Sequence, residues 1–110
     1  MKKISFYVTG KVQGVMFRQT FIRGSLKRKI KGGVTNDAKN HHMVHCSLAG
    51  DASAVDELMN KLREGKPINS WNAQVEELHL HDYFIEFSDH QVNTGNVDDY
   101  DWSPDVAFYL

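Results

Sequence analysis

A turn that contains two glycines and an arginine is the first feature with chemical potential in the chain. It reads GKVQGVMFR and spans residues 10–18. Apolar residues alternate before Gly10, which predicts a strand, and from Phe17 onward they recur at helical spacing. A glycine-containing turn between a strand and a helix directs several backbone N–H groups, and the positive end of the helix dipole, at one point. The stretch therefore predicts a site for a phosphate-sized anion.

Arg18 falls in the first turn of the predicted helix, where its guanidinium can donate two parallel hydrogen bonds to a phosphate. Gly14 lets the backbone approach an anion closely because it has no side chain. From the local pattern alone, a tight turn with a surface arginine is the alternative. The predicted phosphate cradle consists of Gln13, Gly14, Val15, Met16, Phe17 and Arg18.

The common nucleotide-binding loops and metal sites do not fit this chain. A P-loop carries Lys-Ser or Lys-Thr after its second glycine, whereas Val15 and Met16 follow here, and the G-x-G-x-x-G fingerprint is absent. No cysteine or carboxylate completes a zinc site with the histidines. We therefore expect no metal and no other cofactor, and histidines that face solvent. The six histidines are His41, His42, His45, His79, His81 and His90.

Composition indicates one globular domain in a reducing compartment. The chain has 110 residues, of which 41% are hydrophobic and 25% are charged. Cys46 is the only cysteine, so no intrachain disulfide can form, and its alternation with apolar residues predicts a buried, inert thiol. No stretch resembles a signal peptide or is long enough to cross a membrane. We therefore predict a cytoplasmic protein without membrane attachment.

The net charge of −1 is unevenly distributed along the chain. Residues 1–36 contain nine Lys or Arg and no acidic residue, whereas residues 89–110 contain five Asp and no Lys or Arg. A basic first third favours an anionic ligand, although a solvated helix face also explains the charges of residues 27–31. Nucleic acid is a weaker candidate partner, because the predicted strands lack the paired aromatic residues that stack on bases.

Hydrophobic periodicity predicts two helices and at least four strands. The expected strands span residues 4–9, 34–36, 44–48, 73–81 with a bulge near residues 76–77, and 83–87, and the expected helices span 17–29 and 53–64. The order β-α-β-β-α-β is typical of the ferredoxin-like α+β fold, in which two helices cover one face of an antiparallel sheet. Residues 1–90 are expected to form this domain. Residues 91–110 are an acidic and aromatic extension, which is mobile or packs Trp102, Phe108 and Tyr109 on the domain.

The stretch GKVQGVMFR resembles the signature of the acylphosphatases, small cytoplasmic enzymes of ferredoxin-like fold. Residues 32–36, GGVTN, are similar to a second element of that family, and the resemblance covers about residues 3–88. It implies hydrolysis of the carboxyl–phosphate bond of acyl phosphates to a carboxylate and inorganic phosphate, without a metal, a cofactor or a covalent intermediate. In this interpretation the backbone of residues 13–18 holds the phosphate, Arg18 is catalytic, and Asn36 positions the attacking water.

The resemblance also implies partners and has two local departures. An acyl phosphate is the expected substrate, inorganic phosphate is the product and a competitive inhibitor, and we expect a monomer. Gly33 stands where the family usually carries a large aromatic residue. The hairpin after Asn36 is about two residues longer than usual, and Asn40 is the candidate for a left-handed turn position. The competing interpretation is a non-catalytic ferredoxin-like module that binds phosphate or nucleic acid.

Overall fold

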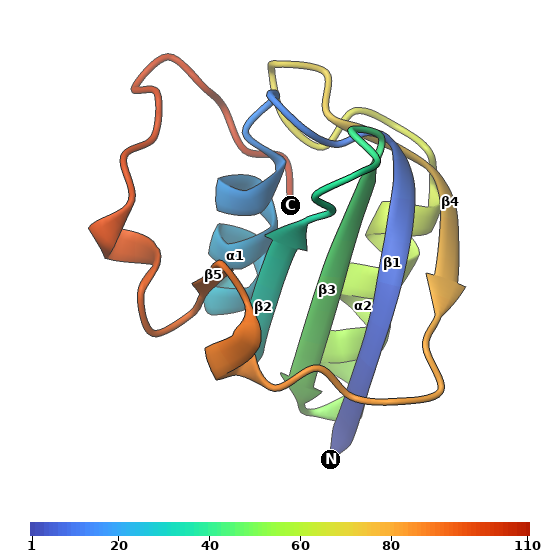
Figure 1. Ribbon diagram of the computed structural model, residues 1–110. Helices are drawn as coiled ribbons and strands as arrows, with labels where there is room; N and C mark the ends of the chain where they lie inside the picture. Colours follow the sequence, from blue (N-terminus) through green and yellow to red (C-terminus); the bar gives the residue numbers. More distant parts are fainter.

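A five-stranded sheet with two helices on one face forms the molecule (Figure 1). The computed structural model describes residues 1–110. All neighbouring strands are antiparallel, in the order β4-β1-β3-β2-β5, so the predicted ferredoxin-like α+β fold is confirmed. Neither helix is long and apolar enough to cross a membrane. The elements are β1 (Lys2–Lys11), α1 (Phe17–Lys27), β2 (Lys31–Asn36), β3 (Met43–Gly50), α2 (Ala52–Arg63), β4 (Gln74–Leu80) and β5 (Val92–Asn93), with short 3-10 helices at Phe87–Asp89 and Val97–Asp99.

The predicted bulge lies in β4, where this strand pairs with β1. Thr9 is opposite Glu77, but the next residue, Gly10, is opposite Val75, so Glu76 is the extra residue. Gly10 has φ 131°, and a Cβ atom there would lie 2.5 Å from the carbonyl oxygen of Gln74. Only glycine fits this position. The first glycine of the GKVQG stretch therefore shapes the end of β1.

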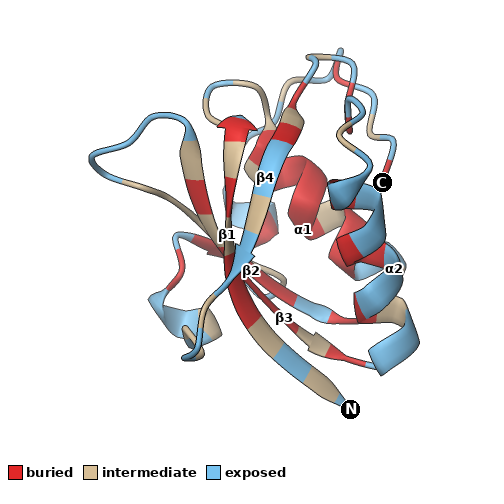
Figure 2. Cartoon of the chain, turned by 90° about the vertical axis from the view of Figure 1, so that its right-hand side faces the viewer, coloured by how far each residue is buried: buried red, intermediate tan, exposed pale blue.

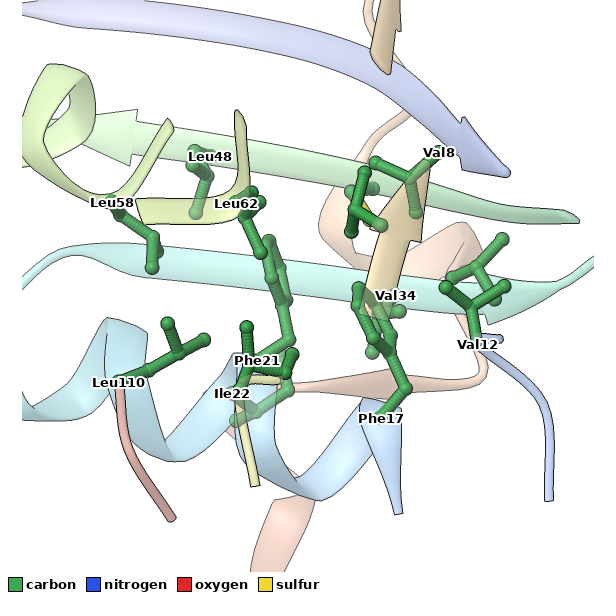
Figure 3. Packing of buried hydrophobic residues seen from close by; sticks show 14 of the residues in the cluster. Val8, Val12, Phe17, Phe21, Ile22, Val34, Leu48, Leu58, Leu62 and Leu110 are labelled. Carbon is green, nitrogen blue, oxygen red and sulfur yellow. The ribbon is translucent and has the colours of Figure 1, made fainter. Parts of the chain in front are cut away.

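The hydrophobic core lies between the sheet and the two helices (Figures 2 and 3). Phe21 of α1 packs at its centre, with ring centroids 6.2 Å from Phe6 of β1 and 6.0 Å from Phe17. Leu58 and Leu62 of α2 close the other side. Cys46 is fully buried among these side chains, and burial raises the pKa of its thiol, as expected for an inert cysteine. Because Phe17 is anchored in this core, the start of α1 has a fixed position.

The segment after β4 differs from the prediction. Residues 83–87 form no strand; the chain instead crosses the sheet face that the helices leave open (Figure 1). The N–H of Ile85 donates to Oγ of Ser5 at 2.8 Å, and Oγ of Ser47 donates to the Ile85 carbonyl at 2.7 Å. Side chains of β1 and β3 thus satisfy this backbone, so it needs no neighbouring strand. The edge position beside β2 belongs to β5.

Residues 91–110 pack beside α1 and the sheet edge, mainly through aliphatic side chains (Figure 1). The buried hydrophobic side chains of this segment are Val92, Val97, Val106 and Leu110. By contrast, Trp102 and Tyr109 remain 44% and 56% exposed and Phe108 is only partly buried, so the aromatic residues are not the main anchors. Arg23 of α1 pairs with Asp98 at 3.0 Å. The acidic segment therefore contacts the basic helix.

Candidate active site

The turn between β1 and α1 leaves the N-terminus of α1 open. Gly14 has φ 75°, and Met16, the residue before the helix, has φ 60°. No side chain caps α1, and its first turn contains no acidic residue. None of the amide N–H groups of residues 13–18 donates a hydrogen bond to another backbone group. Free donors and an uncapped helix dipole are the features that the predicted anion cradle requires.

Gln13 connects the cradle to the hairpin between β2 and β3. Its Nε2 lies 3.1 Å, 3.2 Å and 2.9 Å from the carbonyl oxygens of Asp37, Asn40 and Met43. The side chain of Gln13 therefore faces the hairpin, and only its backbone N–H remains for an anion. No residue in 37–42 has a positive φ, so the predicted left-handed position at Asn40 is wrong.

Asp37 holds the hairpin directly after Asn36. Its Oδ1 lies 2.9 Å from Nε2 of His45, and its Oδ2 accepts hydrogen bonds from the N–H groups of Lys39 and Asn40. These contacts, with that of His45 the largest, lower the pKa of Asp37 to about 2. Side-chain acceptors thus replace the left-handed turn that the sequence predicts, and they fix the longer hairpin.

A pocket of about 230 Å³ lies at the cradle. It brings together the two predicted catalytic residues, Arg18 and Asn36, from α1 and the end of β2. Of the predicted cradle residues, Gln13 and Val15 do not line the pocket, and the carbonyl of Val15 accepts a hydrogen bond from Asn69 at 2.8 Å. The lining residues are Val12, Gly14, Met16, Phe17, Arg18, Gln19, Asn36, Val92, Tyr100 and Asp101.

Gln91 joins the two predicted catalytic residues. Its Oε1 accepts hydrogen bonds from Nη1 of Arg18 at 3.0 Å and from the backbone N–H of Asn36 at 2.9 Å. Its own N–H donates to Oγ1 of Thr35 at 3.0 Å. The side-chain partner of Arg18 is thus a neutral amide, and no carboxylate pairs with its guanidinium. The positive charge of Arg18 therefore remains available to an anion. Sequence reasoning missed Gln91, since no local pattern marks a residue 73 positions from its partner.

The side-chain oxygen of Asn36 is buried and has no hydrogen-bond partner. Buried polar atoms without partners are uncommon in folded proteins. Asn36 lines the pocket, and its backbone is held by pairing with Val44 and by Gln91. Asn36 therefore lies at the pocket with a side-chain oxygen that no protein group satisfies.

A buried histidine, His90, contacts β2 next to the pocket residue Asn36. His90 is 6% exposed; its Nδ1 lies 2.8 Å from Oγ1 of Thr35 and its Nε2 lies 2.7 Å from Oγ of Ser47. The expectation that all histidines face solvent is therefore wrong for His90. A Cβ atom at Gly33 would lie 2.5 Å from Cδ2 of the ring. The imidazole thus occupies the space beside Gly33, where the resemblance predicts a large aromatic side chain.

We expect His90 to make the free energy of unfolding depend on pH. Burial and, to a lesser extent, the charge of His45 lower the pKa of His90 to about 4, against the opposing effect of Asp89. An unfolded histidine titrates near pH ~6.5. The unfolded state therefore binds more protons in this window, and stability falls as pH drops from ~6.5 towards ~4 by up to about 3 kcal/mol.

The measurement is urea unfolding at neutral pH and near the lower end of that window, for the wild type and His90→Gln. Glutamine can still hydrogen-bond to Thr35 and Ser47, but it does not titrate. The wild type is expected to lose more stability than the variant on acidification. Equal losses in both proteins would contradict the assignment of the pH effect to this residue.

Known proteins share the sequence pattern and the fold. The acylphosphatase family profile matches residues 4–91. The acylphosphatase of Shewanella amazonensis is 33% identical over 89 residues, which cover 80% of this chain and 96% of that protein. The acylphosphatase of Pyrobaculum aerophilum is 32% identical over 96 residues, covering 84% and 94%.

Solved acylphosphatase structures have the same arrangement of helices and strands. The crystal structure of the acylphosphatase from Bacillus subtilis superposes with a TM-score of 0.61 at 26% identity, and covers 74% of this chain and 83% of that one. The structure of an acylphosphatase from Coxiella burnetii has a TM-score of 0.57 at 28% identity, with coverage of 76% and 84%. The similarity thus extends over about three quarters of this chain.

Proposed function

Because the chain belongs to the acylphosphatase family and hydrolyses acyl phosphates, we propose that the pocket between α1 and the end of β2 is its active site. One observation carries the proposal: Arg18 and Asn36 line a single pocket and are joined through Oε1 of Gln91.

In this proposal the phosphoryl group of the substrate lies in the cradle. The free N–H groups of residues 13–18 and the guanidinium of Arg18 bind its oxygens, and Gln91 holds that guanidinium in position. A phosphoryl transition state spreads negative charge over the equatorial oxygens. Fixed donors around these oxygens stabilise that charge without reorganisation, which is the main way to accelerate such a reaction.

Asn36 positions the attacking water in this proposal. Its side-chain amide hydrogen-bonds to the water, but an amide cannot take the proton near neutral pH. The water oxygen attacks phosphorus, the bond from phosphorus to the carboxyl oxygen breaks, and its electron pair leaves with the carboxylate. The proton passes to a phosphate oxygen. A carboxylate is a good leaving group, so neither a general acid nor a metal is needed.

We expect hydrolysis of benzoyl phosphate to continue unchanged in the presence of excess EDTA. Inorganic phosphate is expected to raise KM without lowering kcat, because it occupies the same cradle as the phosphoryl group of the substrate. Initial rates measured by ultraviolet absorbance test both points. Loss of activity in EDTA with recovery in zinc or magnesium, or a rate insensitive to phosphate in large excess over substrate, would contradict the proposal.

A further inference from the structure

Part of the pocket wall comes from the segment that follows the family match. The profile ends at residue 91, yet Val92, Tyr100 and Asp101 line the pocket together with the cradle. The pocket volume of about 230 Å³ is several times the ~30 Å³ that one water molecule occupies in the liquid. The pocket therefore has room for a substituent beyond the phosphoryl group, and these three residues are available to contact it.

Hydrogen bonds fix Tyr100 relative to α1 and Gln91. Its hydroxyl donates to the carbonyl of Gln91 at 2.9 Å, and its own carbonyl accepts from Nε2 of the buried Gln19 at 3.3 Å. Arg23, one turn further along α1, pairs with Asp98 at 3.0 Å. Because α1 also carries Arg18, this part of the wall has a defined position relative to the phosphate cradle.

Asp101 follows Tyr100 directly and adds a negative charge to this wall. It is exposed and forms no ion pair with a lysine or arginine. A carboxylate at the edge of an anion site repels a second anionic group and attracts a cationic one. Because the negative charge of Asp101 does not favour binding of the phosphoryl group, we expect it to act on the part of the substrate beyond that group.

We propose that Val92, Tyr100 and Asp101 form the subsite for the acyl group, and that Asp101 favours acyl phosphates with a cationic acyl group over those with a carboxylate. This inference rests on the proposed function of the pocket. An acyl group with an ammonium substituent, as in an aminoacyl phosphate, gains a favourable interaction with Asp101. A dicarboxylic acid monophosphate places its free carboxylate near the same charge and is disfavoured.

Three stable β-ketophosphonates test the inference, because a methylene replaces the bridging oxygen and prevents hydrolysis. The first is acetonylphosphonate, and the other two carry an ammonium or a carboxylate at the far end. By calorimetry at low salt, the wild type is expected to bind the ammonium analogue most tightly and the carboxylate analogue most weakly. In Asp101→Asn, affinity for the ammonium analogue falls and affinity for the carboxylate analogue rises, each by roughly three- to tenfold. Asp105→Asn removes an exposed carboxylate outside the pocket and keeps the wild-type ranking.

Some outcomes would overturn only the acyl subsite, and another would also overturn the proposed active site. If the wild type binds the three analogues equally, or if Asp101→Asn and Asp105→Asn shift the affinities equally, the acyl-subsite proposal is wrong. If Arg18→Ala abolishes binding in that case, the proposed phosphate site is still supported. Unchanged binding of all three analogues to Arg18→Ala places the phosphonate elsewhere and overturns the proposed active site as well.

Discussion

Replacing Arg18 with alanine is expected to abolish phosphate binding and turnover together. The guanidinium contacts the phosphoryl oxygens in both the ground state and the transition state, so its loss affects KM and kcat. Losing an arginine that stabilises a phosphoryl transition state costs ~10³-fold or more in rate. Lysine is expected to restore little activity, since a single ammonium cannot reproduce the planar fork of donors. The measurements are phosphate affinity by calorimetry and kcat/KM with benzoyl phosphate.

Lys27→Ala is the matched control for this experiment. It removes one positive charge from the exposed end of the same helix, at a residue that does not line the pocket. Its affinity for phosphate and its turnover are expected to stay near those of the wild type. If Arg18→Ala binds phosphate and reacts like the wild type, the cradle is not the active site, and a phosphate-binding or nucleic-acid-binding role for this turn becomes the better interpretation.

The geometry of the turn between β1 and α1 could be predicted from sequence because its determinants are local. The strand, the glycine turn and the start of the helix follow one another within 18 residues, and each has its own pattern of spacing or residue type. α1 begins at Phe17, where the helical periodicity places it. Arg18 and Asn36 could be named from the two motifs, but the motifs do not say that the residues meet. Their meeting depends on the pairing of β2 with β3 and on the packing of α1 against β2.

The other half of the pocket depends on contacts that no short pattern reveals. Gln91 reaches Arg18 and Asn36 only because the chain crosses the open sheet face and then adds β5 beside β2. Alternation at residues 83–87 wrongly predicted a strand, because it could not indicate that serine side chains, rather than a neighbouring strand, satisfy the backbone of Ile85. The burial of His90 could not be predicted either, because it depends on a distant residue without a side chain, Gly33, beside which the imidazole packs.

Asn36→Ala is expected to separate binding from chemistry. Its side chain contacts the attacking water in the proposed mechanism, whereas the cradle and Arg18 bind the phosphate. Gln91 accepts from the backbone N–H of Asn36, and this contact survives truncation of the side chain. Arg18 therefore keeps its position and phosphate affinity is retained, while kcat falls by ~10²–10³, the usual scale for one positioned polar group.

Asn40→Ala provides the control, because Asn40 belongs to the same hairpin but does not line the pocket. Its carbonyl accepts from Gln13, and that contact does not need its side chain. Turnover of this variant is expected to stay close to that of the wild type. If Asn36→Ala turns over like the wild type, the longer hairpin has removed this residue from the reaction. If it instead loses phosphate affinity in parallel with kcat, Asn36 binds the phosphoryl group rather than the water, and the attacking water must be held by another group in the pocket.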